Sequence, residues 1–299
     1  MSSTLPRADD LRLIPLEIDD GGTRSRYLLQ PPLLRHDGAI YGGTAIAASM
    51  MAMEAATQRD VQWVTTQFVA PAPNGHVIEM QMDVLASGKR TAQVRVTATI
   101  DGEVMYASLG STGIPRTNGL TGQFETMPVV TPPDESAPRM HGPPRAEAPT
   151  EPGWARECEY LVPEILESPR GGDGTMAMWT RFRSGRPGDR ERAERGASGI
   201  GMSPAQIAFA ADMVPVAIAR GAGKMGAGTS LDNSMRFIGG SDTEWVLLEL
   251  QGNMAAGGYG HGIVRVWSQS GKLLAIGSQT ASMVYMFDES SPPPFLAQS

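Results

Sequence analysis

The same order of predicted elements occurs twice along this chain, and no other feature of the sequence constrains the fold as strongly. In each half a long apolar helix precedes a run of predicted strands, and in the first half apolar and polar residues alternate along residues 78–84 and 92–100. Placing Phe68 on Phe237 brings the turn at Asp101-Gly102 within one residue of the turn at Ser270-Gly271. The sequence therefore predicts a tandem duplication.

Each copy has its own set of predicted elements. In the first half we expect an early strand at 24–30, the helix at 44–58, and strands at 64–69, 78–84, 92–100 and 104–109. In the second half we expect strands at 156–161 and 176–183, a helix from Ser203-Pro204 through Ala219, and strands at 231–238, 245–251, 262–267 and 273–283. This order predicts an α+β fold with two long buried helices, each wrapped by a curved antiparallel sheet.

The two predicted sheets can pair edge to edge across a pseudo-twofold axis, so that each half protects the exposed edge of the other. Such a pairing leaves a groove where the helix of one half meets the strands of the other, and we expect a ligand there.

Prolines are concentrated between Pro115 and Pro152, among polar residues without periodicity. Each proline removes an amide donor and restricts the preceding residue, so this stretch favours an extended linker. We therefore expect an N-terminal domain at 1–115, a linker at 116–152 and a C-terminal domain at 153–299.

Composition excludes several classes of function. Net charge is −7, which is unfavourable for a protein that binds nucleic acid. Cys158 is the single cysteine, and His36, His76, His141 and His261 show no metal-ligand spacing, so we expect neither a disulfide nor a metal. The N-terminus lacks a basic start followed by an apolar run, and no apolar stretch approaches about 18 residues. We expect a soluble, cytoplasmic protein that does not bind membranes.

Short motifs in both halves carry a family resemblance. In the first half these are residues 40–43 (IYGG), 67–69 (QFV), 71–73 (PAP) and 87–90 (SGKR). In the second half they are residues 210–212 (AAD), 229–235 (TSLDNSM) with Phe237, 244–245 (EW), 270–275 (SGKLLA) and 278–279 (SQ). In this order and spacing the chain resembles the double hot-dog acyl-CoA thioesterases of the bacterial thioesterase II type, over roughly 25–113 and 155–286.

The resemblance implies an acyl-CoA substrate, with coenzyme A as part of the substrate and no other cofactor, and a homo-oligomer. It implies a catalytic group formed by Asp212, Ser230 and Gln279. This chain departs from the family pattern in three ways. Ser230 stands where threonine is more usual, the stretch from Asp212 to Ser230 is shorter, and residues 259–261 (YGH) replace the usual Arg-Gly. The last two departures leave the acyl preference open.

The residue types suit thioester hydrolysis, which needs an aimed water and donors for the oxyanion. Asp212 would act as the base, with its pKa raised by apolar neighbours, while Ser230 and Gln279 would orient the water. At the corresponding places of the first half stand Val61 and Gly110, so only one half carries this pair. Without the resemblance, the three residues suit the wetter face of a helix, a turn and a solvent-facing strand.

Other residues have two interpretations each. Gly42 and Gly43 suit oxyanion donors at a helix start, or close packing of helix on sheet. His261 suits a pocket wall or a loop, and we expect Glu54 to be exposed. The basic run that begins at Arg181 and ends at Arg195 suits the phosphates of coenzyme A, or a solvated loop.

Two other functions remain open at this point. A hot-dog enoyl-CoA hydratase would need an aspartate with a histidine five residues on, whereas Asp232 is followed there by Phe237 and Asp37 by Gly42. The second is a protein that binds acyl-CoA or another hydrophobic ligand without turnover.

Overall fold

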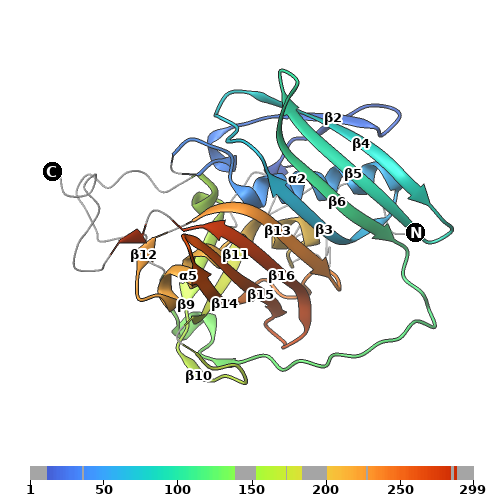
Figure 1. The fold of residues 1–299 in the computed structure, drawn as a ribbon. Helices are drawn as coiled ribbons and strands as arrows, with labels where there is room; N and C mark the ends of the chain where they lie inside the picture. The colour runs from blue at the N-terminus through green and yellow to red at the C-terminus, as the bar shows by residue number, and fades with distance from the viewer. Residues whose placement is uncertain are drawn as a thin grey trace.

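A single large antiparallel sheet dominates the structure, a computed structural model in which residues 12–35, 37–138, 153–172, 174–183, 201–226, 228–283 and 286–287 are described. The sheet has 13 strands in the order β1-β2-β4-β5-β6-β3-β13-β16-β15-β14-β11-β9-β8 (Figure 1). The long helix of the first half crosses behind the strands of that half (Figure 1). Among the described residues, no helix is long and apolar enough to cross a membrane.

The first half follows the predicted order closely. Its elements are β1 (Glu17–Ile18), β2 (Arg24–Leu28), a 3-10 turn η1 (Pro31–Leu33), α2 (Gly42–Thr57), β3 (Asp60–Phe68), β4 (Val77–Ser87), β5 (Thr91–Ile100) and β6 (Glu103–Gly113). Helix α2 begins two residues before the predicted start. It is buried on nearly every side, as its apolar composition predicts, and it packs on β3, β4, β5 and β6.

The second half repeats this arrangement with additional short strands. Its elements are β9 (Cys158–Val162), β10 (Ile165–Glu167), β11 (Thr175–Phe182), α4 (Pro204–Ala210), α5 (Val214–Gly221), β12 (Met225–Gly226), β13 (Thr229–Phe237), β14 (Val246–Ala256), β15 (Tyr259–Ser268), β16 (Leu273–Ser282) and β17 (Met286–Phe287). A 3-10 turn η3 (Gly153–Arg156) precedes β9.

Strand order confirms the predicted duplication. The run β3-β6-β5-β4-β2 has its counterpart in β13-β16-β15-β14-β11. Strands β3 and β13 differ in numbering by 169 residues at both ends, which is the same offset that separates Phe68 from Phe237. The two copies meet where β3 pairs antiparallel with β13, from Trp63 opposite Arg236 to Gln67 opposite Asp232. The predicted edge-to-edge pairing is therefore present, and it makes one continuous sheet.

The predicted continuous helix of the second half is wrong: it is two helices, α4 and α5, separated by Ala211, Asp212 and Met213. Pro215 supplies the physical reason. It has no N–H with which to bond the carbonyl of Ala211, so the helical ladder cannot continue through this point. The Met213 N–H bonds the Ala211 carbonyl instead, at 2.8 Å. Asp212 therefore lies in the break between two helices.

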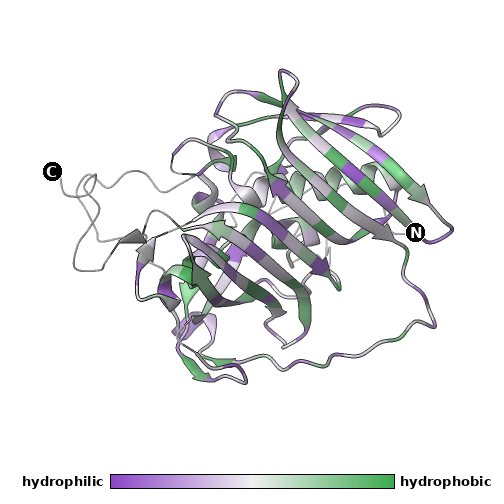
Figure 2. Ribbon diagram, viewed as in Figure 1, coloured by the Kyte–Doolittle hydropathy of each residue, from purple (hydrophilic) through white to green (hydrophobic). Residues whose placement is uncertain are grey.

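Buried and exposed residues alternate along β4 and β5, and Figure 2 shows apolar and polar residues there as alternating green and purple bands. One large core fills the space between the helices and the sheet. A second, smaller core lies on the opposite face of the second-half sheet and includes Trp179, Trp245, Leu247 and Trp267.

Part of the Pro-rich stretch covers this second core. It contains β7 (Val129–Val130), which pairs with β10, a 3-10 turn η2 (Pro133–Glu135), and β8 (Ala137–Pro138), which pairs with β9. The indole N–H of Trp179 donates to the Thr131 carbonyl at 2.8 Å. The expected linker therefore packs on the second half from about residue 123 to residue 138, while residues 139–152 lie outside the described part.

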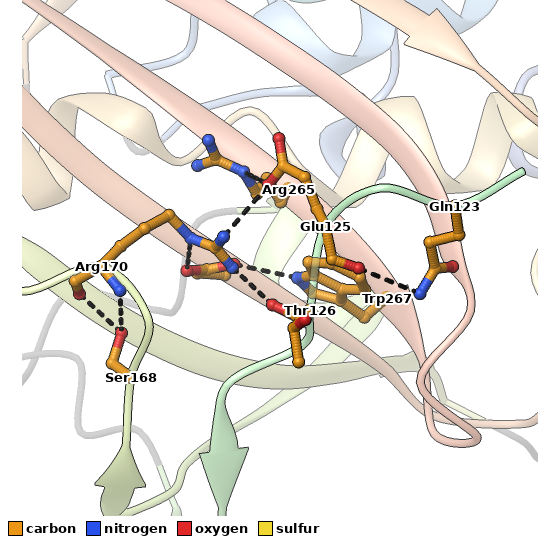
Figure 3. Close-up of polar contacts among 8 residues, drawn as sticks. Gln123, Glu125, Thr126, Ser168, Arg170, Arg265 and Trp267 are labelled. Carbon is orange, nitrogen blue, oxygen red and sulfur yellow. Dashed lines mark hydrogen bonds and ion pairs between the residues drawn. The ribbon is translucent and has the colours of Figure 1, made fainter.

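An ion-pair network fastens this segment to the sheet (Figure 3). The Arg170 guanidinium donates to both carboxylate oxygens of Glu249, at 2.6 and 2.8 Å, and to Glu125 at 3.1 Å. Arg265 also donates to Glu125, and Trp267 donates to Glu249 at 3.0 Å. Since Glu249 is only 2% exposed, its charge depends on these partners.

Candidate active site

Asp212 is a buried carboxylate at the junction of the two halves. It lies in the break between α4 and α5, and its side chain faces the first turn of α2 and the strands β13 and β16. Tyr41, which precedes α2, donates its hydroxyl to the Asp212 backbone carbonyl at 3.2 Å. This is where the helix of one half meets the strands of the other, the place at which the duplication predicts a ligand.

Two amide side chains converge on one carboxylate oxygen of Asp212. Gln279 on β16 donates from Nε2 to Oδ1 at 2.7 Å, and Asn233 on β13 donates from Nδ2 to the same atom at 2.9 Å. Gln279 also donates from Nε2 to Oγ of Ser230, with 2.6 Å between the nitrogen and the oxygen. The structure thus brings together Asp212, Ser230 and Gln279, and it adds Asn233, which the sequence analysis missed.

A β-bulge explains how Ser230 reaches this group. Asn233 pairs with Gln279, and both side chains are on the helix-facing side of the sheet. Simple alternation would turn Ser230 to the opposite side. The register shifts by one residue at Leu231, however, so that Ser230 pairs with Ala281 on the helix-facing side. Strand β3 has the same shift between Val61 and Trp63, at the corresponding place of the first half.

The pKa of Asp212 is raised above its ordinary value, and burial is the main cause because it disfavours the charged form. Hydrogen bonds from Asn233, Gln279 and the Gly43 backbone act in the opposite direction, as does the more distant Arg35. Asp212 is 8% exposed, and Asn233 and Gln279 are each 2% exposed. A desolvated carboxylate held by neutral donors is a stronger base than an ordinary aspartate.

Gly42 and Gly43 both lie against this site. A Cβ atom on Gly42 would overlap Oδ2 of Asp212, and one on Gly43 would overlap the Phe209 carbonyl oxygen. The Gly43 N–H bonds the Asp212 carboxylate. Close packing, one of the two interpretations offered by the sequence, is therefore present at both positions, and α2 directs its unpaired amide end at the carboxylate.

His261 does not join the group. It is exposed on β15 and its Nδ1 lies 3.0 Å from Oγ1 of Thr280, on the face of the sheet opposite to Gln279. Successive side chains of a strand point to opposite faces, and Gly262, not His261, pairs with Gln279.

Glu54 is half-buried, and the expectation that it is exposed is wrong, since its Oε1 accepts from the Val61 N–H at 3.0 Å. In the basic run, Arg181 pairs with Glu159 and Glu244 at 2.9 and 2.6 Å. The part of that run from 184 to 195, and His36 and His141, lie outside the described residues.

The corresponding place in the first half is apolar. Gly110 stands where Gln279 stands in the second half, and a Cβ atom there would lie 2.6 Å from the Met53 sulfur. Val61, the counterpart of Ser230, is buried. Methionine therefore occupies the space that the polar group occupies in the second half. In the described part of the chain, no cluster of three or more His, Cys, Asp or Glu could hold a metal ion.

Two family models match nearly all of the two repeated units. The acyl-CoA thioesterase N-terminal domain matches residues 31–113, and the acyl-CoA thioesterase C-terminal domain matches residues 133–283. The chain belongs to the acyl-CoA thioesterase family. Both halves of this thioesterase are hot-dog units, and the protein is a thioester hydrolase.

Solved structures agree with this assignment. A candidate thioesterase from Novosphingobium aromaticivorans is 28% identical, with a TM-score of 0.74 over 90% of this chain and 98% of the other. The tesB protein of Mycobacterium avium subs paratuberculosis is 21% identical (TM-score 0.68, 95% and 98% covered), and acyl-CoA thioesterase II from Mycobacterium marinum is 18% identical (TM-score 0.69, 92% and 98% covered). At these identities the last two show the fold alone. No curated protein matches the chain.

Proposed function

We propose that this thioesterase hydrolyses acyl-CoA to the free acid and coenzyme A, using a water that Asp212, Ser230 and Gln279 hold and activate. The observation that carries this proposal is the continuous hydrogen-bonded chain from Asp212 through the Gln279 amide to Ser230. It joins a buried base to two neutral groups that can fix the direction of a water.

Ser230 and Gln279 can each form a further hydrogen bond to a water, and Asp212 can accept its proton. Ser230 accepts its hydrogen bond from Gln279, so its own O–H can donate to a water. Gln279 Oε1 is buried and has no hydrogen-bond partner among the described residues, so a water bound within the site would supply its missing hydrogen bond. Asp212 accepts the proton that the water loses as its oxygen attacks the thioester carbon. When the C–S bond breaks, the coenzyme A thiolate leaves and takes that proton from the Asp212 carboxyl.

The oxyanion needs donors near the same carbon. The Gly42 N–H, at the first position of α2, has no acceptor within its own helix. Thr44 and Ala45 donate to the Tyr41 carbonyl, at 3.0 and 3.4 Å, and Gly43 donates to Asp212. We assign Gly42 as the oxyanion donor, supported by the positive end of the helix dipole.

Release of free coenzyme A from short, medium, long and aromatic acyl-CoAs tests this proposal. Asp212→Asn should lower kcat/KM by about 100-fold or more on whichever substrate is hydrolysed. Asp232→Asn is the matched control, because Asp232 is on the same sheet but bonds the Thr280 N–H at 3.0 Å on the other face. It should stay close to wild type. Binding of acyl-CoA without any release by the wild-type protein would contradict hydrolysis and favour the binding protein instead.

Among the residues that the structure describes, none in the site supports the hydratase alternative. The Asp212 side chain is bonded by Asn233, Gln279 and the Gly43 amide, and none of these can serve as the imidazole partner that such an enzyme needs. A cytoplasmic location and a homo-oligomeric state remain predictions from the sequence.

A further inference from the structure

We infer that Asn233 is a positioning residue that makes Oδ2 of Asp212, and not Oδ1, the oxygen that accepts the proton. This inference rests on the proposed hydrolysis for its catalytic meaning. Asn233 was not among the site residues predicted from the sequence.

Both lone pairs of Oδ1 of Asp212 are occupied by hydrogen bonds. A carboxylate oxygen has two in-plane lone-pair directions, and Oδ1 already accepts from Asn233 at 2.9 Å and from Gln279 at 2.7 Å. Both donors are buried and come from neighbouring strands, with Asn233 directly opposite Gln279 in the β13–β16 pairing. Oδ1 is therefore occupied, and the backbone register holds its two donors in place.

Oδ2 of Asp212 lies at the start of helix α2. This oxygen lies against the first turn of α2, so close that a side chain on Gly42 would overlap it. The Gly43 N–H also bonds the carboxylate, and with Oδ1 filled by two donors this leaves one lone pair of Oδ2 for the proton. The amide end of α2 favours the charged carboxylate, so it keeps Asp212 ionised until it accepts that proton. Oδ2 therefore lies beside Gly42, the residue proposed as the oxyanion donor.

The hydrogen bonds of the Asn233 side chain indicate that it orients Asp212. Its described side-chain hydrogen bond is the one to Asp212, and its Oδ1 has no partner among the described residues. A buried amide that only supports the fold usually satisfies both of its polar groups. Thr66, opposite Asn233 on β3, bonds Ser108 at 2.8 Å.

In the described part of the chain, few charged groups act on Asp212 from the surrounding elements. Arg35 lowers its pKa from a distance and is itself paired with Asp37. Tyr41 bonds the Asp212 backbone, and Tyr160 on β9 bonds the Ala210 carbonyl at 3.1 Å. Asp232 is on the other face of β13, and the first turn of α2 contains no acidic residue. Asn233, Gln279 and the Gly43 amide therefore act on the Asp212 carboxylate directly, and Asn233 can be changed without altering the contact to Ser230 or the start of α2.

Two substitutions at Asn233 test the inference, with Ser234→Ala as the matched control, because Ser234 bonds Thr65 at 2.6 Å on the other face. Asn233→Asp puts a second carboxylate beside Oδ1, so that the pair shares a proton. Asn233→Ala removes a donor and frees a lone pair. We expect both to move the acid limb of the kcat/KM profile upward, by about one pH unit or more for Asn233→Asp. We expect kcat to fall while KM stays near wild type, and Ser234→Ala to leave the profile unchanged.

A carbon-13 titration of the Asp212 carboxyl, assigned by its loss in Asp212→Asn, gives the same comparison without any substrate. A raised pKa in both Asn233 variants supports the inference. An acid limb and a carboxyl titration that stay at their wild-type positions in folded Asn233 variants overturn it, even if Asp212→Asn is inactive. If the wild-type protein hydrolyses no acyl-CoA, the proposed function fails, and the carboxyl titration still decides the role of Asn233.

Discussion

A Cβ atom on Gly42 would overlap Oδ2 of Asp212, so the first residue of α2 and the carboxylate in the break between α4 and α5 occupy adjoining space. We predict that Gly42→Ala lowers kcat/KM by about 100-fold. The added methyl group would displace the Asp212 carboxylate by about 1 Å, so that it no longer lies in position to accept the proton of the water. The measurement is coenzyme A release under saturating and limiting substrate.

Gly239→Ala is the control for this change, because a Cβ atom there meets nothing within 4 Å and its φ is not in the left-handed region. It should retain wild-type activity. Full activity in Gly42→Ala would mean that Asp212 does not work from the position seen in the structure.

Ser230→Ala tests the water-holding hydroxyl. It removes the acceptor for one hydrogen of the Gln279 amide and a donor to the water, and we expect kcat to fall about tenfold, in line with the loss of one hydrogen bond. Ser230→Thr keeps the hydroxyl and should recover most of the activity. Ser278→Ala, at an exposed position of the same sheet, should have no effect. Equal activity in Ser230→Ala and wild type would remove Ser230 from the mechanism.

The raised pKa of Asp212 has a defined effect on stability. A folded pKa above the unfolded value means that the folded protein holds a proton that the unfolded chain has released, so stability is greatest below the unfolded pKa. Stability then falls as the pH rises through the folded pKa. Asp212→Asn does not show this decrease in stability, because an asparagine side chain does not titrate in this pH range. We expect its free energy of unfolding, relative to wild type, to increase by about 1.4 kcal/mol for each pH unit between the two pKa values.

Urea unfolding at a series of pH values from below about 3.8 to neutral measures this difference. A difference between Asp212→Asn and wild type that stays constant over the whole range would show that Asp212 is not desolvated in solution.

The network in Figure 3 predicts a large stability effect far from the active site. Arg170→Ala leaves the carboxylate of Glu249 buried without its bidentate partner, which should cost about 3–5 kcal/mol. Arg26→Ala is the contrast. It breaks the pair with Glu17, in which both side chains are more than half exposed, and should cost about 0–1 kcal/mol. Adding Glu249→Gln to Arg170→Ala should restore part of the loss, and equal losses in the two single variants would contradict this ranking.

The sheet could be predicted from the sequence because each strand carries its own signal. Period-two alternation located the strands at 78–84 and 92–100 in the first half, and the Asp101-Gly102 turn adopts the two positive φ values, 50° and 85°, that a tight hairpin needs. The offset between Phe68 and Phe237 then related the halves. Chain order gives the pairing within β4-β5-β6 and β14-β15-β16, whereas β3 pairs with β6 and β13 with β16, which are not their neighbours in sequence.

The active site depended on features that have weaker local signals. Helical periodicity continues through Asp212, so only Pro215, four residues after Ala211, indicated a break. Alternation alone would have turned Ser230 away from Gln279, because the bulge at Leu231 depends on pairing with β16. Asn233 was within reach of sequence reasoning. It is two and four residues before the buried Met235 and Phe237, which predicts a buried amide in need of a partner.

A single turnover in water enriched in oxygen-18 tests the proposed role of Asp212 most directly. The enzyme is in excess over an acyl-CoA that it hydrolyses. If Asp212 acts as a base toward water, the released acid contains one oxygen-18 atom and Asp212 contains none. If Asp212 attacks the thioester itself and the resulting anhydride is opened at the aspartyl carbon, the acid contains no oxygen-18 and the label is in Asp212. We predict the first result, and the second would contradict the proposed role of Asp212.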